Sequence, residues 1–202
     1  MNVLLLIDIQ NDFLPGGALA VPDGDAVIDV ANHLIASAQH VVATQDWHPV
    51  GHGSFASQHD GVSVGEVFDL DGVPQVAWPD HCVQDTVGAK FADSLLVDRI
   101  DHVVHKGTQQ MIDSYSGFFD NDHRQATGLH DYLQSVKATE LTVVGLATDY
   151  CVKFTVLDAL KLGYQVRVVI DGCRGVNLSP NDVDTAIAEM QSAGAELNSS
   201  EV

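Results

Sequence analysis

The stretch ELTVVGLATDYCVKFTVLDAL, residues 140–160, decides the fold predicted for this chain. It begins with a short apolar run, 141–146, whose length and β-branched content are typical of a strand buried on both faces. Polar residues at 147–150 end the strand, and apolar residues then recur every three or four positions over 152–162, as on one face of a helix. A buried strand, a short turn and a helix are the repeating unit of an α/β protein.

Cys151 falls in the first turn of this helix. The free backbone N–H groups and the positive end of the helix dipole favour a thiolate at such a position, which suits a nucleophile. The layout resembles the strand, turn, nucleophile and helix of hydrolases, although the Gly-x-Ser-x-Gly elbow itself is absent. The alternative is a small buried apolar residue, the usual fate of a free cysteine.

The same alternation of buried strand and helix runs along the rest of the chain. The pattern predicts strands at 3–7, 40–44, 102–105, 166–170 and 195–198, and helices at 25–38, 128–136 and 183–193. Successive strand–helix–strand units give parallel strands with right-handed crossovers. We therefore predict one domain over residues 1–202, an α/β fold with three α/β/α layers and a mostly parallel six-stranded sheet. Two long loops, 45–85 and 107–124, interrupt the series, and loops of this length in compact domains are usually functional or disordered.

Composition limits the classes of function. The chain has 202 residues, 46% of them hydrophobic, and a formal net charge of -19 from 9 basic and 28 acidic residues. This charge argues against binding nucleic acid or an anionic membrane, and one hypothesis for it is adaptation to a salty habitat. Three cysteines are too few for a secreted disulfide framework, and the start of the chain is neither a signal peptide nor a membrane span, so we predict a cytoplasmic protein.

Three residues with useful chemistry lie at the predicted ends of buried strands. Asp8 follows the first strand, Lys106 follows the strand at 102–105, and Cys151 follows the strand at 141–146. The carboxyl ends of parallel strands meet at one edge, where sheets of this class bind ligands, so we expect an acid, a cation and a thiol to converge there. Taken singly, Asp8 could instead cap a turn and Lys106 could be a surface lysine.

The first long loop carries a possible metal-binding cluster. Asp46 and His48 are two residues apart, His52 follows, and His81 lies further along the loop. Three imidazoles and a carboxylate suit Zn²⁺, Fe²⁺ or Mn²⁺ with positions left open for water or substrate. The alternative, exposed loop histidines, stays open because the chain has 10 histidines and some would cluster by chance.

Six segments together carry a resemblance to a known family. They are DIQNDF (8–13), DWHP (46–49), WPDHC (78–82), HKG (105–107), YSGF (115–118) and GLATDYCV (145–152). In order and over nearly the whole chain they resemble the bacterial pyrazinamidase/nicotinamidase family of the isochorismatase-like cysteine hydrolases. The resemblance implies a nicotinamide amidohydrolase of NAD salvage, which forms nicotinate and ammonia and also hydrolyses pyrazinamide.

The resemblance also assigns roles to particular residues. It implies that Cys151 is the nucleophile, Asp8 the acid that takes its proton, and Lys106 the cation that orders the pair. It implies a cis peptide bond before Ala147, whose N–H forms the oxyanion hole together with that of Cys151.

The remaining implied roles concern the metal and the ring of the substrate. The resemblance implies one divalent transition metal, zinc in the first place, with iron or manganese as alternatives. Its implied ligands are Asp46, His48, His52 and His81. Phe13 and Trp78 match the aromatic residues that flank the pyridine ring.

Other readings remain open on the sequence alone. A related amidase with a non-pyridine substrate would share the fold and the thiol chemistry, and a metal-loaded sensor would have Cys151 oxidised rather than acylated. A Rossmann dinucleotide-binding enzyme is excluded because no Gly-x-Gly-x-x-Gly follows any strand. The metal, the oligomeric state, the selectivity among pyridine amides and the role of residues 108–111 are not predicted.

Overall fold

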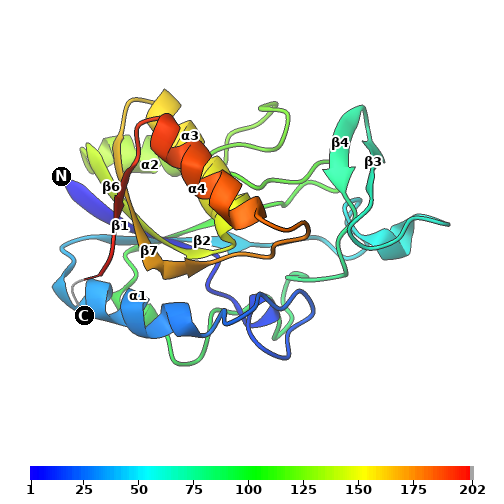
Figure 1. Cartoon of the computed structure of the whole chain (residues 1–202), viewed down its shortest axis with the longest axis horizontal. Helices are drawn as coiled ribbons and strands as arrows, with labels where there is room; N and C mark the ends of the chain where they lie inside the picture. Colours follow the sequence, from blue (N-terminus) through cyan, green and yellow to red (C-terminus); the bar gives the residue numbers. More distant parts are fainter. Residues whose placement is uncertain (201–202) are drawn as a thin grey trace.

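A six-stranded parallel sheet forms the centre of the computed structural model, which describes residues 1–200 (Figure 1). Its strands, in spatial order, are β5 (His102–Lys106), β2 (Val41–Asp46), β1 (Asn2–Ile7), β6 (Glu140–Leu146), β7 (Gln165–Arg174) and β8 (Glu196–Asn198). The chain builds outward from β1 to one edge and then from β6 to the other. The reversal of strand order lies between β1 and β6, and a crevice opens at such a point beyond the carboxyl ends of the strands.

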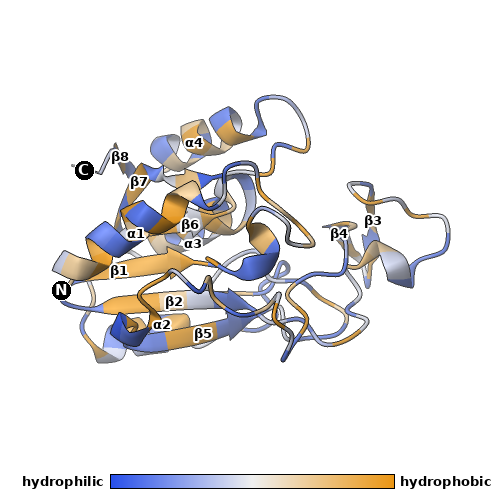
Figure 2. Ribbon diagram, turned by 90° about the horizontal axis from the view of Figure 1, so that it is seen from below, coloured by the Kyte–Doolittle hydropathy of each residue, from blue (hydrophilic) through white to orange (hydrophobic). Residues whose placement is uncertain are grey.

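Helices cover both faces of the sheet, which gives the predicted three layers (Figures 1 and 2). One face packs against α1 (Ala26–Ser37), and the other carries α2 (Leu129–Ser135), α3 (Lys153–Lys161) and α4 (Asp182–Ser192). Shorter turns are helical at Asn11–Phe13, Ala56–Gln58, Val97–Arg99 and, with π-helical geometry, Thr148–Val152. The α/β prediction is confirmed, with all five strand pairings of this sheet parallel.

The alternation of side chains along β1 explains why the sheet is buried on both faces. Val3, Leu5 and Ile7 belong to the core beneath α2, α3 and α4, whereas Leu4 and Leu6 belong to the core beneath α1. Successive residues of a strand point to opposite faces, so a continuous apolar run fills both cores at once.

A small antiparallel hairpin was not predicted. It is formed by β3 (Val67–Leu70) and β4 (Val73–Val76) in the first long loop, and it stands apart from the main sheet in Figures 1 and 2. Asp71 and Gly72 form its turn with φ angles of 51° and 83°, the left-handed pair that favours Asp-Gly in two-residue hairpins. The Asp-Gly dipeptide is a sequence signal for such a hairpin turn. The two flanking strands, however, are only four residues each, which is too short for a clear strand pattern.

The predicted element ends differ by a few residues from those observed. The largest difference is in β7, which runs over Gln165–Arg174 instead of 166–170 because pairing with β6 continues past a bulge to Arg174.

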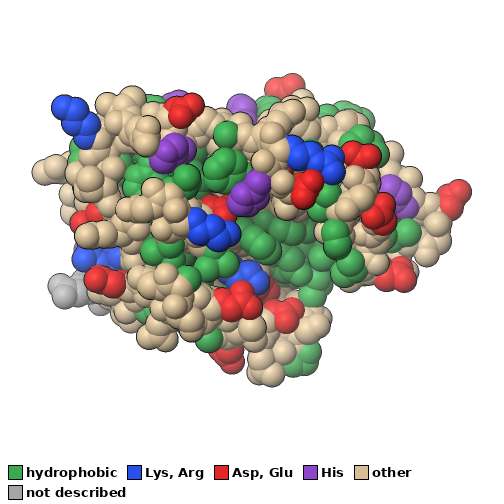
Figure 3. Space-filling model, turned by 90° about the horizontal axis from the view of Figure 1, so that it is seen from above, with side chains coloured by type: hydrophobic (Ala, Val, Ile, Leu, Met, Phe, Trp, Pro, Cys, Tyr) green, Lys and Arg blue, Asp and Glu red, His purple; other side chains and the backbone are tan. Residues whose placement is uncertain are grey.

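Acidic side chains are spread over the face seen in Figure 3, where Lys and Arg side chains stand apart from one another. Within residues 1–200, every helix is too short or too polar to cross a lipid bilayer.

Candidate active site and metal centre

Four strands place polar side chains at one edge of the sheet. Asp8 directly follows β1, Asp46 ends β2, and Lys106 ends β5. Cys151 follows β6 and lies within the π-helical turn that leads into α3. The structure therefore brings together the acid, the cation and the thiol that the strand ends predicted.

Lys106 is the centre of this group, with a side chain only 1% exposed. Its ammonium nitrogen lies 3.0 Å from Oδ2 of Asp8 and 3.0 Å from Oδ1 of Asp46. It also lies 2.9 Å from the carbonyl oxygen of Ser114 and 3.4 Å from the sulfur of Cys151. Burial alone would lower the pKa of Lys106, but the two carboxylates raise it well above its usual value. The cation is therefore permanent at neutral pH.

Asp8 is held in place by β2 as well as by Lys106. The hydroxyl of Thr44 donates a 2.6 Å hydrogen bond to Oδ1 of Asp8, and the backbone N–H of Asp8 donates back to that hydroxyl at 3.3 Å. Complete burial raises the pKa of Asp8 in spite of the nearby Lys106 cation. A carboxylate whose pKa is raised in this way is a better proton acceptor than one in water.

The thiol of Cys151 is buried and un-ionised at neutral pH. Burial raises the pKa of Cys151 well above its ordinary value and outweighs the lowering effect of Lys106. This corrects the expectation that the helix start alone would favour a thiolate. The turn at Cys151 is π-helical and the sulfur lies in the interior, where desolvation of the charged form dominates. The thiol thus needs a base to take its proton as it reacts.

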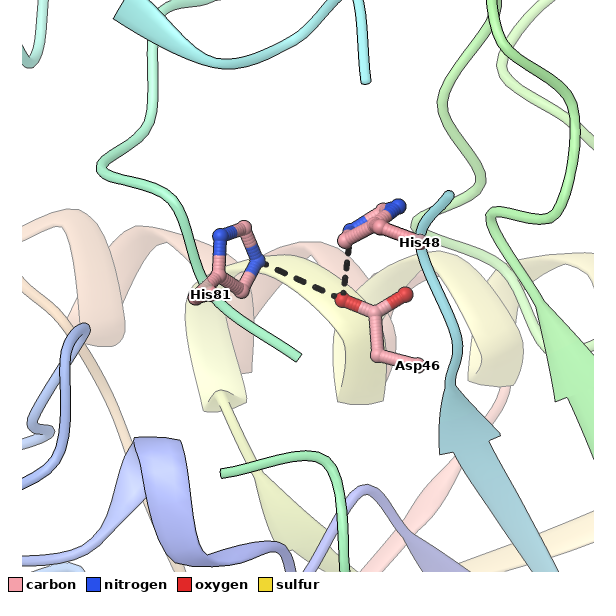
Figure 4. Close-up of side chains that lie close together, drawn as sticks. All are labelled: Asp46, His48 and His81. Atoms are coloured by element: carbon pink, nitrogen blue, oxygen red, sulfur yellow. Dashed lines mark ion pairs between the residues drawn. The ribbon is translucent and has the colours of Figure 1, made fainter. Parts of the chain in front are cut away.

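Asp46, His48 and His81 form a second group beside the first (Figure 4). Oδ2 of Asp46 lies 3.0 Å from Nε2 of His48 and 3.4 Å from Nε2 of His81. Nδ1 of His48 is 2.9 Å from the carbonyl oxygen of Gly107, and Nδ1 of His81 is 2.8 Å from that of Pro79. A carbonyl only accepts hydrogen bonds, so each Nδ1 carries a hydrogen and each Nε2 is the nitrogen that a metal would bind.

This arrangement fits a divalent transition metal. Metal-binding histidines characteristically donate one ring N–H to a carbonyl or carboxylate and bind through the other nitrogen. Nε2 of His48 is buried and faces Oδ2 of Asp46 at 3.0 Å, so the nitrogen and the carboxylate are placed to bind one metal together. Without a metal, burial lowers the pKa of His48 but Asp46 raises it to about 9, so a binding cation must displace a proton.

His52 is not part of the group that Asp46, His48 and His81 form, and its role as the fourth metal ligand stays a prediction. It belongs to a different group with His48 and Asp113. Nε2 of His52 lies 2.8 Å from the carbonyl oxygen of Gln109, and Nδ1 lies 2.8 Å from the hydroxyl of Ser54. Nε2 therefore carries the hydrogen and Nδ1 accepts one, which leaves neither nitrogen a free lone pair for a metal.

A small cavity of about 20 Å³ adjoins both groups. The predicted residues that line it are Phe13, Asp46, Trp78, His81, Ala147 and Cys151, and the further lining residues are Leu19, Asp113, Tyr115, Tyr150 and Val176. The peptide bond between Leu146 and Ala147 is cis, as the resemblance implied. The thiol, the aromatic side chains and the metal-facing side chains thus share one cavity.

Sequence reasoning missed several supporting residues. Thr44 and Gln10 lie in or beside buried strands and gave no periodic signal of their own. The side chain of Gln10 is fully buried, accepts a hydrogen bond from the backbone N–H of Asp46 at 2.8 Å and donates one to its carbonyl at 2.8 Å. Gln10 lies within the DIQNDF segment, but the sequence did not show that its side chain contacts the backbone of Asp46.

The family model, the similar sequences and the similar structures all indicate the same family. The isochorismatase domain model matches residues 2–202. The chain is 58% identical to the nicotinamidase of Escherichia coli over 200 residues, covering 97% of this chain and 93% of that protein. The structure of the Acinetobacter baumannii nicotinamidase/pyrazinamidase superposes with a TM-score of 0.95 at 41% identity, over 98% of this chain and 96% of that one. The pyrazinamidase of Pyrococcus horikoshii, solved in complex with zinc, gives 0.81 at 35% identity, over 98% of each chain.

Proposed function

The chain belongs to the isochorismatase family, and from this premise we propose that it is a nicotinamidase that hydrolyses nicotinamide to nicotinate and ammonia. One observation carries the proposal: Cys151 of the buried Asp8–Lys106–Cys151 cluster lines the same cavity as Asp46 and His81 of the metal-binding group. The 58% identity to the Escherichia coli nicotinamidase supports the same substrate. Pyrazinamide, which has a ring nitrogen in the same relation to its carboxamide, is a second substrate of the same class.

The cavity has the chemistry that a flat heteroaromatic amide requires. Phe13 and Trp78 offer apolar and π surface to a pyridine ring. Asp46, His48 and His81 would hold a divalent metal, zinc in the first place, which supplies a Lewis-acidic position for the ring nitrogen. This would distinguish a pyridine carboxamide from other amides.

The first half of the reaction is acyl transfer to the thiol. Asp8 takes the proton of Cys151 as the sulfur attacks the carboxamide carbon, and the carbonyl electron pair moves to oxygen. The backbone N–H groups of Ala147 and Cys151 stabilise this oxyanion. Collapse of the tetrahedral species expels the amine, to which Asp8 returns the proton, so that ammonia leaves and a nicotinoyl thioester remains.

The second half releases the acid. Asp8, again a carboxylate, takes a proton from water as its oxygen attacks the thioester carbon. The thiolate leaves and is reprotonated, and nicotinate is released. Lys106 stays protonated throughout and stabilises the negative charge that passes between Asp8 and Cys151. Each proton transfer thus occurs between groups that already lie around one ammonium.

We also place the protein in the cytoplasm and in NAD salvage. All three cysteines are free thiols, which fits a reducing compartment. The excess of acidic residues gives no surface for nucleic acid.

Ammonia release from nicotinamide by zinc-loaded protein tests the proposal directly. We expect release by the wild type and none by Cys151→Ala, with the same circular dichroism spectrum and the same zinc content in both proteins. A folded, zinc-loaded wild type that releases no ammonia would contradict the substrate assignment. Release by Cys151→Ala would contradict the thiol mechanism instead, and benzamide, which lacks the ring nitrogen, should be a poor substrate.

A further inference from the structure

Gln75 is a buried polar residue in an otherwise outlying part of the molecule. It lies in β4 of the hairpin that stands apart from the main sheet (Figures 1 and 2), yet it is only 1% exposed. Its neighbour Pro74 is exposed. Burying an amide is unfavourable unless it is hydrogen-bonded, so the contacts of Gln75 need an explanation.

Those contacts are with the segment that follows β5. Nε2 of Gln75 lies 3.0 Å from Oδ2 of Asp113 and 3.0 Å from the hydroxyl oxygen of Tyr115. It is also 2.9 Å from the carbonyl oxygen of Val76, and Oε1 accepts a 3.2 Å hydrogen bond from Nδ2 of Asn121. The amide thus reaches out of the hairpin and is fully engaged by the body of the protein.

The Tyr115 hydroxyl connects this amide to the cavity wall. It accepts a second hydrogen bond, of 3.1 Å, from the indole N–H of Trp78. Trp78 and Tyr115 both line the cavity, and the Trp78 ring also meets the Tyr150 ring edge to face at 4.9 Å and 86°. A buried indole has one donor only, so the partner of that donor fixes the plane of the ring.

Other contacts also attach the hairpin to the body of the protein. Arg124 Nη1 lies 3.0 Å from Oδ2 of Asp71 at the hairpin turn. The backbone N–H of Trp78 donates to the carbonyl of Ser54 at 2.8 Å, just beyond the end of β4. The buried amide is therefore available for a more specific task than anchoring.

We propose that Gln75 is a positioning residue for the substrate: it fixes the Tyr115 hydroxyl, which in turn fixes the plane of the Trp78 indole against the heteroaromatic ring. This rests on the proposed function, because Trp78 contacts a ring only if the substrate is a pyridine carboxamide. No hydrogen bond joins Gln75 to Asp8, Lys106 or Cys151. Its loss should therefore weaken ring binding and leave the acyl-transfer chemistry intact.

Steady-state kinetics on nicotinamide test the kinetic consequence. We expect Gln75→Leu and Tyr115→Phe each to raise KM about ten-fold, the effect of one lost buried hydrogen bond, with kcat within about two-fold of wild type. Because the two residues act in one chain of contacts, the double variant should be no worse than Tyr115→Phe alone. The matched control is Asp71→Asn, which removes the charge of the exposed ion pair in the same hairpin, tolerates the left-handed backbone of the turn and should leave KM unchanged.

Acrylamide quenching of Trp78 fluorescence gives a readout that needs no turnover. Trp47 and Trp78 are the two tryptophans of the chain, so Trp47→Phe makes Trp78 the single emitter. In that background Gln75→Leu and Tyr115→Phe should each increase the quenching constant, and Asp71→Asn should not. If Gln75→Leu does not fold, Gln75→Met and Tyr115→Phe test the same proposal. Unchanged KM and quenching in the folded variants, or equal changes in Asp71→Asn, would overturn the proposal. Failure of wild type to release ammonia, with quenching as expected, would count against the proposed function alone.

Discussion

The ammonium nitrogen of Lys106 lies 3.0 Å from Oδ1 of Asp46, whose other carboxylate oxygen faces the metal-binding histidines. The same ammonium lies 3.0 Å from Asp8, which serves the thiol. One buried cation therefore joins the metal-binding half of the site to the reactive half. Neither carboxylate could be buried at this spacing without it, since like charges in the interior repel strongly.

We therefore expect Lys106→Met to lower the free energy of unfolding as well as turnover. The change leaves the buried Asp8 without its cation and Asp46 with His48 alone, and removing one partner of a buried ion pair typically costs about 3–5 kcal/mol. We expect that loss in the free energy of unfolding of the metal-free protein, measured by guanidinium titration at neutral pH. Arg124→Met, which removes exposed ion pairs to Asp71 and Asp122, should have a much smaller effect. Equal losses in the two variants would contradict this role of Lys106.

The number of metal ligands can be tested with two histidines of the same loop. His48→Ala removes the Nε2 that faces Asp46 and should lower zinc affinity by more than about 100-fold, beyond the 10–100-fold typical of an outer-shell partner. His52→Ala removes a ring whose nitrogens are already engaged, so zinc affinity should stay within about ten-fold of wild type and stoichiometry at one. Titration of the apo-protein with zinc against a competing chelator measures both.

A larger loss of zinc affinity in His52→Ala than in His48→Ala would show that His52 is a ligand. Equal loss of zinc in the two variants would show that binding the metal turns His52 away from Gln109 and Ser54. Circular dichroism of both apo-proteins is the control for folding, because His52 also contacts Phe55 at a ring distance of 5.6 Å.

The sheet and the catalytic cluster could be predicted because both follow from local pattern. Continuous apolar runs such as 3–7 specify strands buried on both faces, and parallel strands place their carboxyl ends at one edge. The positions of Asp8, Lys106 and Cys151 directly after such runs were therefore sufficient to bring them together. Their contacts followed from topology without knowledge of any long-range distance.

Features that depend on distant partners could not be predicted in the same way. The tautomer of His52 depends on the carbonyl of Gln109, 57 residues away, and spacing alone grouped this histidine with Asp46. The raised pKa of Cys151 depends on how deeply the sulfur is buried, which a helix start does not reveal. The path from Gln75 through Tyr115 to Trp78 likewise joins two loops that only the folded chain brings together.

The net charge of -19 predicts that salt stabilises the protein. Repulsion among surface carboxylates opposes the compact state, and screening relieves it as the Debye length falls from about 10 Å at 0.1 M to about 3 Å at 1 M salt. We expect Tm to rise steadily from low salt to about 1 M NaCl. Sucrose at equal osmolality is the control, since it is excluded from the surface without screening charge. No rise with NaCl, or an equal rise with sucrose, would contradict the electrostatic explanation.

The buried thiols predict a loss of stability at alkaline pH. Burial raises the pKa of Cys173 to about 12 and raises those of Cys82 and Cys151 well above their ordinary value. An unfolded thiol ionises near pH 8.5, so above that pH the unfolded chain loses protons that the folded protein keeps. The contribution of each thiol is complete below about pH 8.5 and falls by about 1.4 kcal/mol per pH unit as the pH rises toward the folded pKa.

Cys173→Ala isolates one of these three contributions, because Cys173 does not line the cavity beside Cys151. The lost packing contacts of the sulfur lower stability equally at every pH, whereas the ionisation effect changes the slope. Between pH 9 and 10 the free energy of unfolding of the metal-free, reduced variant should fall less steeply than that of the wild type, by about 1.4 kcal/mol per pH unit. Urea titrations at closely spaced pH values measure the difference. Parallel slopes would mean that Cys173 ionises as readily in the folded protein as in the unfolded chain, and that its burial does not perturb its titration.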